Sequence, residues 1–148
     1  MEDGMKEVFI SVDVETSGPI PGEYSMLSVG ACVVGDASKR FYAELKPLND
    51  NYLQEYIAVC GFNMDELKIN GVDPAKAMRN FERWVREAAG HDRPVFVAFN
   101  ATFDWMFVQY YLHRFLGRSP FGFSGLDIKA YYMGMAGCAW SETTKSKL

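Results

Sequence analysis

Residues 8–18 of the chain read VFISVDVETSG, an apolar run rich in β-branched residues that ends in two acids. This composition predicts a buried strand, and the glycines and prolines of residues 17–22 must end it. Side chains two positions apart on a strand share a face, so Asp13 and Glu15 project together near its carboxyl end. The strand that builds the core therefore also delivers two neighbouring carboxylates.

This pair of acids has two explanations. Neighbouring carboxylates repel each other unless a cation lies between them, and a hard divalent ion with oxygen ligands meets that need. Alternatively, the strand emerges into solvent here, because acid pairs are common on protein surfaces. The Asp-x-Glu pattern of residues 13–15 does not by itself decide between a metal site and a solvated strand end.

The next part of the chain predicts a small antiparallel sheet followed by a helix. Residues 26–34 and 40–45 read as strands with short links, which favours a three-stranded antiparallel meander. Asp73 followed by Pro74 is a typical helix start. The apolar positions of that helix recur at the spacing of one helix face: Phe81, Trp84, Val85 and Ala88.

The second half predicts a buried strand and two more helices. Residues 94–99 form a nearly continuous apolar run, typical of a strand covered on both faces. Residues 103–116 have helical spacing and are closed by Gly117, and a last helix runs from Asp127, its N-cap, to about residue 135. The fold class is therefore α/β, a mixed sheet of three antiparallel strands followed by parallel strand(s), with helices on both faces.

A third acid, Asp104, falls where the strand 94–99 gives way to a helix. In open α/β sheets, sites form at the carboxyl ends of strands, where Asp13 and Glu15 also lie. This coincidence favours a metal site. The alternative for Asp104 is an acid placed by the dipole at the start of its helix.

Composition narrows the class of protein. The 148 residues are 49% hydrophobic and 15% aromatic, enough for a single domain with its own core. A net charge of -4 excludes a generally basic nucleic-acid binder, so such contacts must come from local patches or bound metal ions. Cys32, Cys60 and Cys138 lack paired spacing, which fits the reducing cytoplasm, and neither a secretory signal nor a membrane span is found.

Two motifs carry a resemblance to a known family. Residues 12–19 (VDVETSGP) and 98–104 (AFNATFD) resemble the first and second motifs of the DEDD, or DnaQ-like, 3′–5′ exonuclease superfamily. Within the superfamily, the motifs resemble those of the histidine (DEDDh) subclass. The family has a ribonuclease H-like fold, with which the predicted order of strands and helices agrees. The resemblance implies a nuclease that releases nucleoside monophosphates from single-stranded 3′ ends of DNA or RNA.

The resemblance also implies roles for individual residues. Asp13, Glu15 and Asp104 match three of the family's four metal-binding acids, which hold two divalent cations, Mg²⁺ or Mn²⁺, about 4 Å apart around the scissile phosphate. Positions that meet the terminal nucleotide are matched by Thr16, Ser17, Asn100 and Phe103. Phe103 fits a core residue equally well, because an aromatic side chain at the start of an amphipathic helix usually packs inward.

Three departures from the family concern how the substrate end is held. Pro19 stands where many relatives have a bulky apolar wedge against the last base. Residues 70–72 (NGV) resemble a stretch that often reads His-Gly-Ile, and Phe99 replaces a frequent histidine. None of these changes touches the metal-binding acids.

The family's third motif, a histidine or tyrosine base followed by the fourth metal-binding acid, is not found. His91 lies before the strand 94–99, and His113 lies late in the following helix, so we expect neither to reach the metals. Tyr131 and Tyr132 have no aspartate after them. We therefore interpret residues 1–148 as a single exonuclease domain truncated before its C-terminal helix with the third motif, and inactive or weak by itself.

Other functions remain open at this stage. The chain could be a non-catalytic exonuclease-like module that binds nucleic-acid ends or a protein partner, or its acids could serve an endonuclease or another phosphoryl transfer. Retention of Asp13, Glu15 and Asp104 weighs against a binding module, which has no need for mutually repelling acids. Homodimers occur among relatives such as RNase T and oligoribonuclease, and the aromatic content fits a dimer interface and a core equally.

Overall fold

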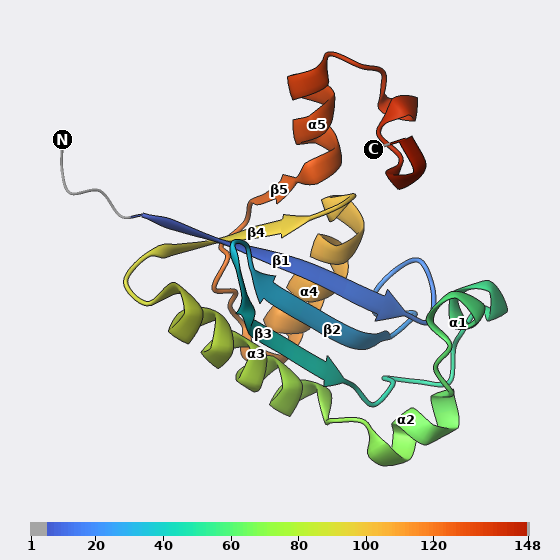
Figure 1. Ribbon diagram of the computed structural model, residues 1–148. Helices are drawn as coiled ribbons and strands as arrows, with labels where there is room; N and C mark the ends of the chain where they lie inside the picture. The colour runs from blue at the N-terminus through green and yellow to red at the C-terminus, as the bar shows by residue number, and fades with distance from the viewer. Residues whose placement is uncertain (1–5, 148) are drawn as a thin grey trace.

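The computed structural model describes residues 6–147, which form one mixed sheet with helices around it (Figure 1). Along the chain the strands are β1 (Glu7–Thr16), β2 (Met26–Val33), β3 (Asp36–Glu44), β4 (Arg93–Ala98) and β5 (Gly125–Asp127). The helices are α1 (Gln54–Cys60), α2 (Met64–Asn70), α3 (Pro74–Ala89), α4 (Ala101–Leu116) and α5 (Ile128–Ala136). Two short 3-10 helices follow, Trp140–Glu142 and Lys145–Lys147.

The sheet has the order β3-β2-β1-β4-β5, with β1 at its centre. β1 pairs antiparallel with β2, and β2 pairs antiparallel with β3, which confirms the predicted meander. β4 and β5 then add parallel pairing on the other side of β1. Ile10, Val12 and Val14 are buried on one face of β1, and the side chains between them point to the opposite face.

Helices α3 and α4 cover the apolar face of the sheet (Figure 1). Phe81 of α3 and Phe107 of α4 are fully buried in the same core as Ile10. The hydroxyl of Tyr111, also fully buried on α4, accepts the backbone N–H of Met26 at 2.9 Å. Burial raises the pKa of Tyr111 to about 12, so it remains a neutral hydroxyl that fixes α4 against β2.

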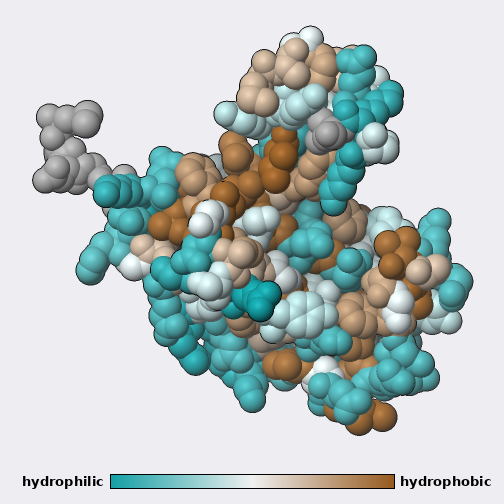
Figure 2. All heavy atoms as spheres, in the orientation of Figure 1, coloured by the Kyte–Doolittle hydropathy of each residue, from teal (hydrophilic) through white to brown (hydrophobic). Residues whose placement is uncertain are grey.

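The C-terminal part of the chain packs less tightly. No residue of α5 is buried, and Figure 1 shows this helix standing beyond the edge strand β5. Apolar surface is visible where this region meets the rest of the molecule (Figure 2), and exposed apolar side chains include Leu126, Met133 and Met135. Among residues 6–147 there is no helix with both the length and the apolar character needed to cross a membrane.

The sequence predicted the long elements and missed the short ones. Helices α3 and α4 and strand β4 lie where they were expected, and Asp127 caps α5 as predicted. Helices α1 and α2 have seven residues each, too few to show a helical period. Strand β5 has three residues and begins with glycine, so its pairing with β4 leaves no pattern in the sequence.

Candidate active site

The two sequence motifs meet where β4 ends. β1 pairs with β4 only as far as Ser11, because β4 stops at Ala98 and the chain turns into α4. The end of β1 therefore has no neighbouring strand on that side. Asp104, in the first turn of α4, takes its place: its Oδ1 accepts the backbone N–H of Val14 at 3.0 Å. This hydrogen bond holds Asp104, the acid of the second motif, against Val14, the residue that separates Asp13 and Glu15 in the first motif.

The environment of Asp104 destabilises the charged form of its carboxyl group. Its side chain is buried, and this burial, together with the nearby negative charge of Asp13, raises the pKa of Asp104 to about 7. The hydrogen bond from Val14 opposes this shift by stabilising the charged form.

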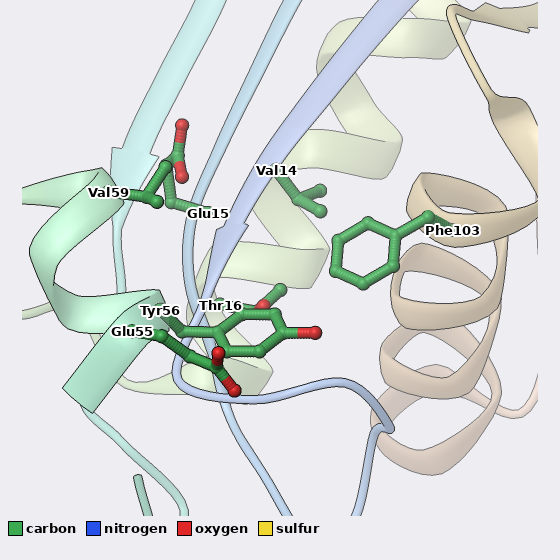
Figure 3. A pocket seen from close by; sticks show the side chains of 7 residues that line it. All are labelled: Val14, Glu15, Thr16, Glu55, Tyr56, Val59 and Phe103. Carbon is green, nitrogen blue, oxygen red and sulfur yellow. The ribbon is translucent and has the colours of Figure 1, made fainter. Parts of the chain in front are cut away.

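Glu15 lies on the other side of the pocket from Asp104's helix. Partial burial, and then the charge of Asp13, raise the pKa of Glu15. Figure 3 shows the Glu15 side chain beside Val59 of α1. Within residues 6–147, no three Asp, Glu, His or Cys side chains converge closely enough to hold a metal ion. The structure thus brings Asp13 and Asp104 together, and the three-acid metal site remains a prediction.

A pocket opens beside these acids. It has a volume of about 390 Å³ and is lined by Val14, Glu15, Thr16, Glu55, Tyr56, Val59 and Phe103. In Figure 3 the rings of Tyr56 and Phe103 project into it from opposite sides. Thr16 and Phe103, two of the predicted substrate-binding residues, line this pocket, and their contact with a nucleotide remains a prediction. The sequence analysis did not predict Tyr56 and Val59 of α1 as pocket residues. What distinguishes them is that an aromatic and an apolar side chain stay unburied on a short helix.

The turn after β1 explains how α1 reaches the pocket. The backbone N–H of Leu53, at the start of α1, donates to the carbonyl of Ser17 at 2.8 Å. The hydroxyl of Ser17 is buried and accepts the N–H of Ser25 at 2.9 Å. Gly18 has no room for a side chain, because a Cβ there would lie 2.2 Å from the ring of Tyr24. Ser17 thus holds the pocket wall, and it does not itself line the pocket.

The first turn of α4 is held from outside its own sequence. Asn100 precedes the helix in a left-handed conformation (φ 60°) and makes no side-chain cap, so the N–H of Ala101 needs another acceptor. Asp127 provides it: Oδ1 accepts from Ala101 at 3.1 Å and from Lys129 at 3.2 Å. Asp127 therefore joins the starts of α4 and α5, a role that its predicted capping of α5 did not reveal. Asn100 is exposed and lies outside the pocket lining.

The candidate proton acceptors lie away from the acids, as the sequence indicated. His91 is exposed in the turn that precedes β4, and His113 is exposed in the last turn of α4. Each histidine is thus at the opposite end of its element from the pocket. Tyr131 and Tyr132 belong to α5. Residues 70–72, the NGV stretch, also lie outside the pocket lining.

Comparison with solved structures identifies the class of fold. The zinc-bound complex of Escherichia coli exonuclease I with single-stranded DNA has a TM-score of 0.71 and 15% identity, covering 88% of this chain and 30% of exonuclease I. A product-bound exonuclease I structure has a TM-score of 0.70, also at 15% identity. The match covers 88% of this chain and 32% of that exonuclease I chain. The chain therefore spans about a third of these neighbours, and it has the ribonuclease H-like fold of their nuclease class.

Sequence comparison gives the family. No family model matches the sequence. A curated Escherichia coli protein named 3′–5′ DNA exonuclease Cap18 is 47% identical over 144 residues, which cover 97% of this chain and 77% of that protein. The chain belongs to the DEDD, or DnaQ-like, 3′–5′ exonuclease superfamily. The resemblance of residues 12–19 and 98–104 is thereby confirmed.

Proposed function

We propose that this domain is the nuclease part of a metal-dependent 3′–5′ exonuclease that removes nucleoside monophosphates from single-stranded DNA. The observation that supports it best is the contact of Asp104 with Val14 of β1, which brings acids of both motifs together next to residues that line the pocket. The pocket volume, about 390 Å³, lies within the range of about 300–1,000 Å³ typical of small-ligand sites. DNA as substrate is supported by the 47% identical relative, which is named a 3′–5′ DNA exonuclease.

The donor set fits divalent cations. Asp13, Glu15 and Asp104 offer carboxylate oxygens, the ligands that Mg²⁺ and Mn²⁺ prefer. The raised pKa values of Asp104 and Glu15 reflect partial or full burial near the charge of Asp13, and bound cations would stabilise the charged forms of these acids. Two such ions, when bound, supply an activated water and stabilise the charge that develops on the phosphate and the leaving oxygen.

The chain's own groups would hold the substrate. Tyr56 and Phe103 face each other across the pocket, and we assign them to the two sides of the terminal base (Figure 3). The backbone N–H of Val14 holds Asp104 in place during the reaction. Thr16 lines the floor of the pocket, where we expect it to meet the terminal sugar.

We further infer that residues 1–148 contain neither the general base nor the fourth acid of the histidine subclass. His91 and His113 are remote from the acids, and about a quarter of the curated relative lies outside the matched part. The chain alone should therefore cut weakly or not at all. We also propose a cytoplasmic location, because Cys32, Cys60 and Cys138 are unpaired, as is usual for proteins of a reducing compartment.

The test compares this chain with one extended by the segment that follows the matched region of the relative. A 5′-labelled single-stranded oligonucleotide is incubated with each chain in Mg²⁺ or Mn²⁺. We expect progressive shortening from the 3′ end by the extended chain, and loss of this activity in its Asp13→Ala variant. Equal cutting of free and 3′-blocked ends would contradict an exonuclease. Binding without shortening would instead support a non-catalytic module that holds nucleic-acid ends.

A further inference from the structure

A cluster of two lysines and two aromatic rings lies where the chain leaves β4, against α5 and the last 3-10 helices. The ammonium Nζ of Lys129 is 5.5 Å from the ring centre of Phe99 and 4.6 Å from that of Trp140. The Nζ of Lys145 is 5.1 Å from the same Phe99 ring. Phe99 follows β4, Lys129 belongs to α5, and the other two lie in the last 3-10 helices. The ring of Phe99 therefore makes cation–π contacts with two lysines that belong to different elements.

The register of the sheet places this cluster at the level of the catalytic acids. Val97 of β4 pairs with Ser11 of β1. Phe99 directly follows the end of β4, and Asp13 lies two residues beyond Ser11 in β1, so both lie near the same end of these two strands. A strand of nucleic acid whose 3′ end enters the pocket would leave past this end of the sheet.

The two lysines carry charge that the described residues do not neutralise. No carboxylate among residues 6–147 lies within ion-pair distance of Lys129 or Lys145. The acids nearest in sequence are already engaged with backbone N–H groups. Asp127 accepts from Ala101 and Lys129, and Glu142 accepts from Ala139. The cluster is therefore a local cationic patch on a chain whose net charge is -4.

We infer that this cluster, Phe99, Lys129, Trp140 and Lys145, binds backbone phosphates of the single strand whose 3′ end occupies the pocket. The inference rests on the proposed exonuclease function and adds a subsite to it. The lysines would each meet a phosphate, and Trp140, which is 47% exposed, offers a ring face on which a base can stack. Because the rings hold the ammonium groups in place, little side-chain entropy is lost on binding.

The test measures how salt weakens binding. The dissociation constant of the chain for a fluorescent single-stranded DNA is measured by anisotropy in Ca²⁺ between 50 and 200 mM KCl. Each phosphate contact on a single strand contributes about 0.7 to the slope of log affinity against log salt. Replacing both lysines, Lys129→Gln with Lys145→Gln, should therefore make the slope shallower by about 1.4. The arginine pair at the same positions should keep the slope.

A charge-matched control separates the subsite from general electrostatics. Lys39 on β3 and Lys147 in the last helix are exposed and are replaced by glutamine together. We expect their variant to keep the slope of the unmodified chain. If the Lys129 and Lys145 variant kept that slope too, the cluster would not be a phosphate subsite, although the exonuclease proposal would stand. If the unmodified chain failed to bind single-stranded DNA, both proposals would be wrong.

Discussion

Asp104 is a buried acid that lies near a second acid and contacts one backbone N–H. Its Oδ1 satisfies the buried N–H of Val14, but a neutral acceptor could do the same without the cost of burying a charged group. The group is retained although its charged form is destabilised by burial and by Asp13. Such destabilised ionisable groups are typical of functional sites, because the site is complete only when a ligand restores the balance of charge.

The raised pKa of Asp104 predicts how stability depends on pH. The pKa is about 7 in the folded chain against 3.8 for an ordinary aspartate, so the folded state binds the proton more tightly. This contribution to stability is fully present below about pH 4 and is lost as pH rises through about 7. In EDTA, the Tm should therefore fall between pH 5 and pH 8, and it should fall less in Asp104→Asn.

Two controls belong to this experiment. Glu87→Gln removes an exposed carboxylate of α3 and should leave the dependence of Tm on pH unchanged. Adding Mg²⁺ or Mn²⁺ at pH 8 should raise the Tm of the unmodified chain more than that of Asp104→Asn, since the ion binds the charged acid. Equal pH profiles in the unmodified chain and Asp104→Asn would show that Asp104 is not the group that titrates.

Single residues of the site differ in how far the sequence could predict them. Asp13 and Glu15 lie near the end of β1 and Asp104 comes after β4, and both strands are readable from composition, so their common end of the sheet was predictable. Tyr56 was not, because its place in the pocket depends on a backbone hydrogen bond from Leu53 to the Ser17 carbonyl. That contact joins a turn and a short helix, neither of which has a periodic pattern.

At the scale of elements, one carboxylate holds two helix starts. Asp127 accepts the N–H groups of Ala101 in α4 and of Lys129 and Ala130 in α5. Strand pairing of Asp127 with Ala98 brings it to the start of α4. The position of Asp104, one turn into α4, thus depends on a residue of β5, and this dependence could not be read from either segment alone.

Replacing Asp127 should therefore weaken both stability and metal binding. Loss of a helix cap costs about 0.5–2 kcal/mol, so Asp127→Ala should lower the free energy of unfolding in urea by that order. Asp127→Asn should lose less, because the amide oxygen still accepts a hydrogen bond. Asp73→Ala removes the cap of α3, far from the acids, and serves as the matched control.

The two capping variants differ in one further measurement. Asp127→Ala should also weaken Mn²⁺ binding, measured by calorimetry, because the first turn of α4 carries Asp104. Asp73→Ala should leave Mn²⁺ affinity unchanged. An equal effect of the two substitutions on Mn²⁺ affinity would mean that Asp127 is only a structural cap.

Gly71 marks the tightest junction between elements. A Cβ at Gly71 would lie 2.5 Å from the carbonyl oxygen of Leu67 and 2.5 Å from the backbone N of Lys46. Val72 then exchanges backbone hydrogen bonds with Glu44 and Lys46, so this stretch ties α2 to the end of β3. Its glycine is explained by packing, and the substrate role suggested by the family resemblance is not needed to account for it.

Gly71→Ala should consequently destabilise the fold. Overpacking of this kind costs about 1–3 kcal/mol, and backbone atoms cannot move aside as a flexible side chain can. Gly134 in α5 offers the matched control, since a Cβ there meets no atom within 4 Å. Gly134→Ala should be neutral or stabilising by up to about 1 kcal/mol, because alanine favours a helix. Urea unfolding of both variants would test this, and equal losses would contradict it.

At the scale of the whole molecule, stability is distributed unevenly. The centre of the sheet and the helices α3 and α4 share one core, in which Ile10, Phe81 and Phe107 are fully buried. The region of β5 and α5 contributes no fully buried side chain. The mixed sheet was predictable because its strands are apolar, whereas the loose attachment of α5 was not, because its apolar sequence equally fits a buried helix.

This uneven burial predicts the order of amide hydrogen exchange. Amides in elements with few buried contacts exchange through local opening, whereas those of a shared core require nearly global unfolding. Mass spectrometry should therefore show α5 exchanging much faster than β1, β2 and α4. Asp127→Ala should speed exchange in the first turn of α4 as well, since it frees the N–H of Ala101. Equal protection of α5 and α4 would mean that α5 packs more firmly than its exposure indicates.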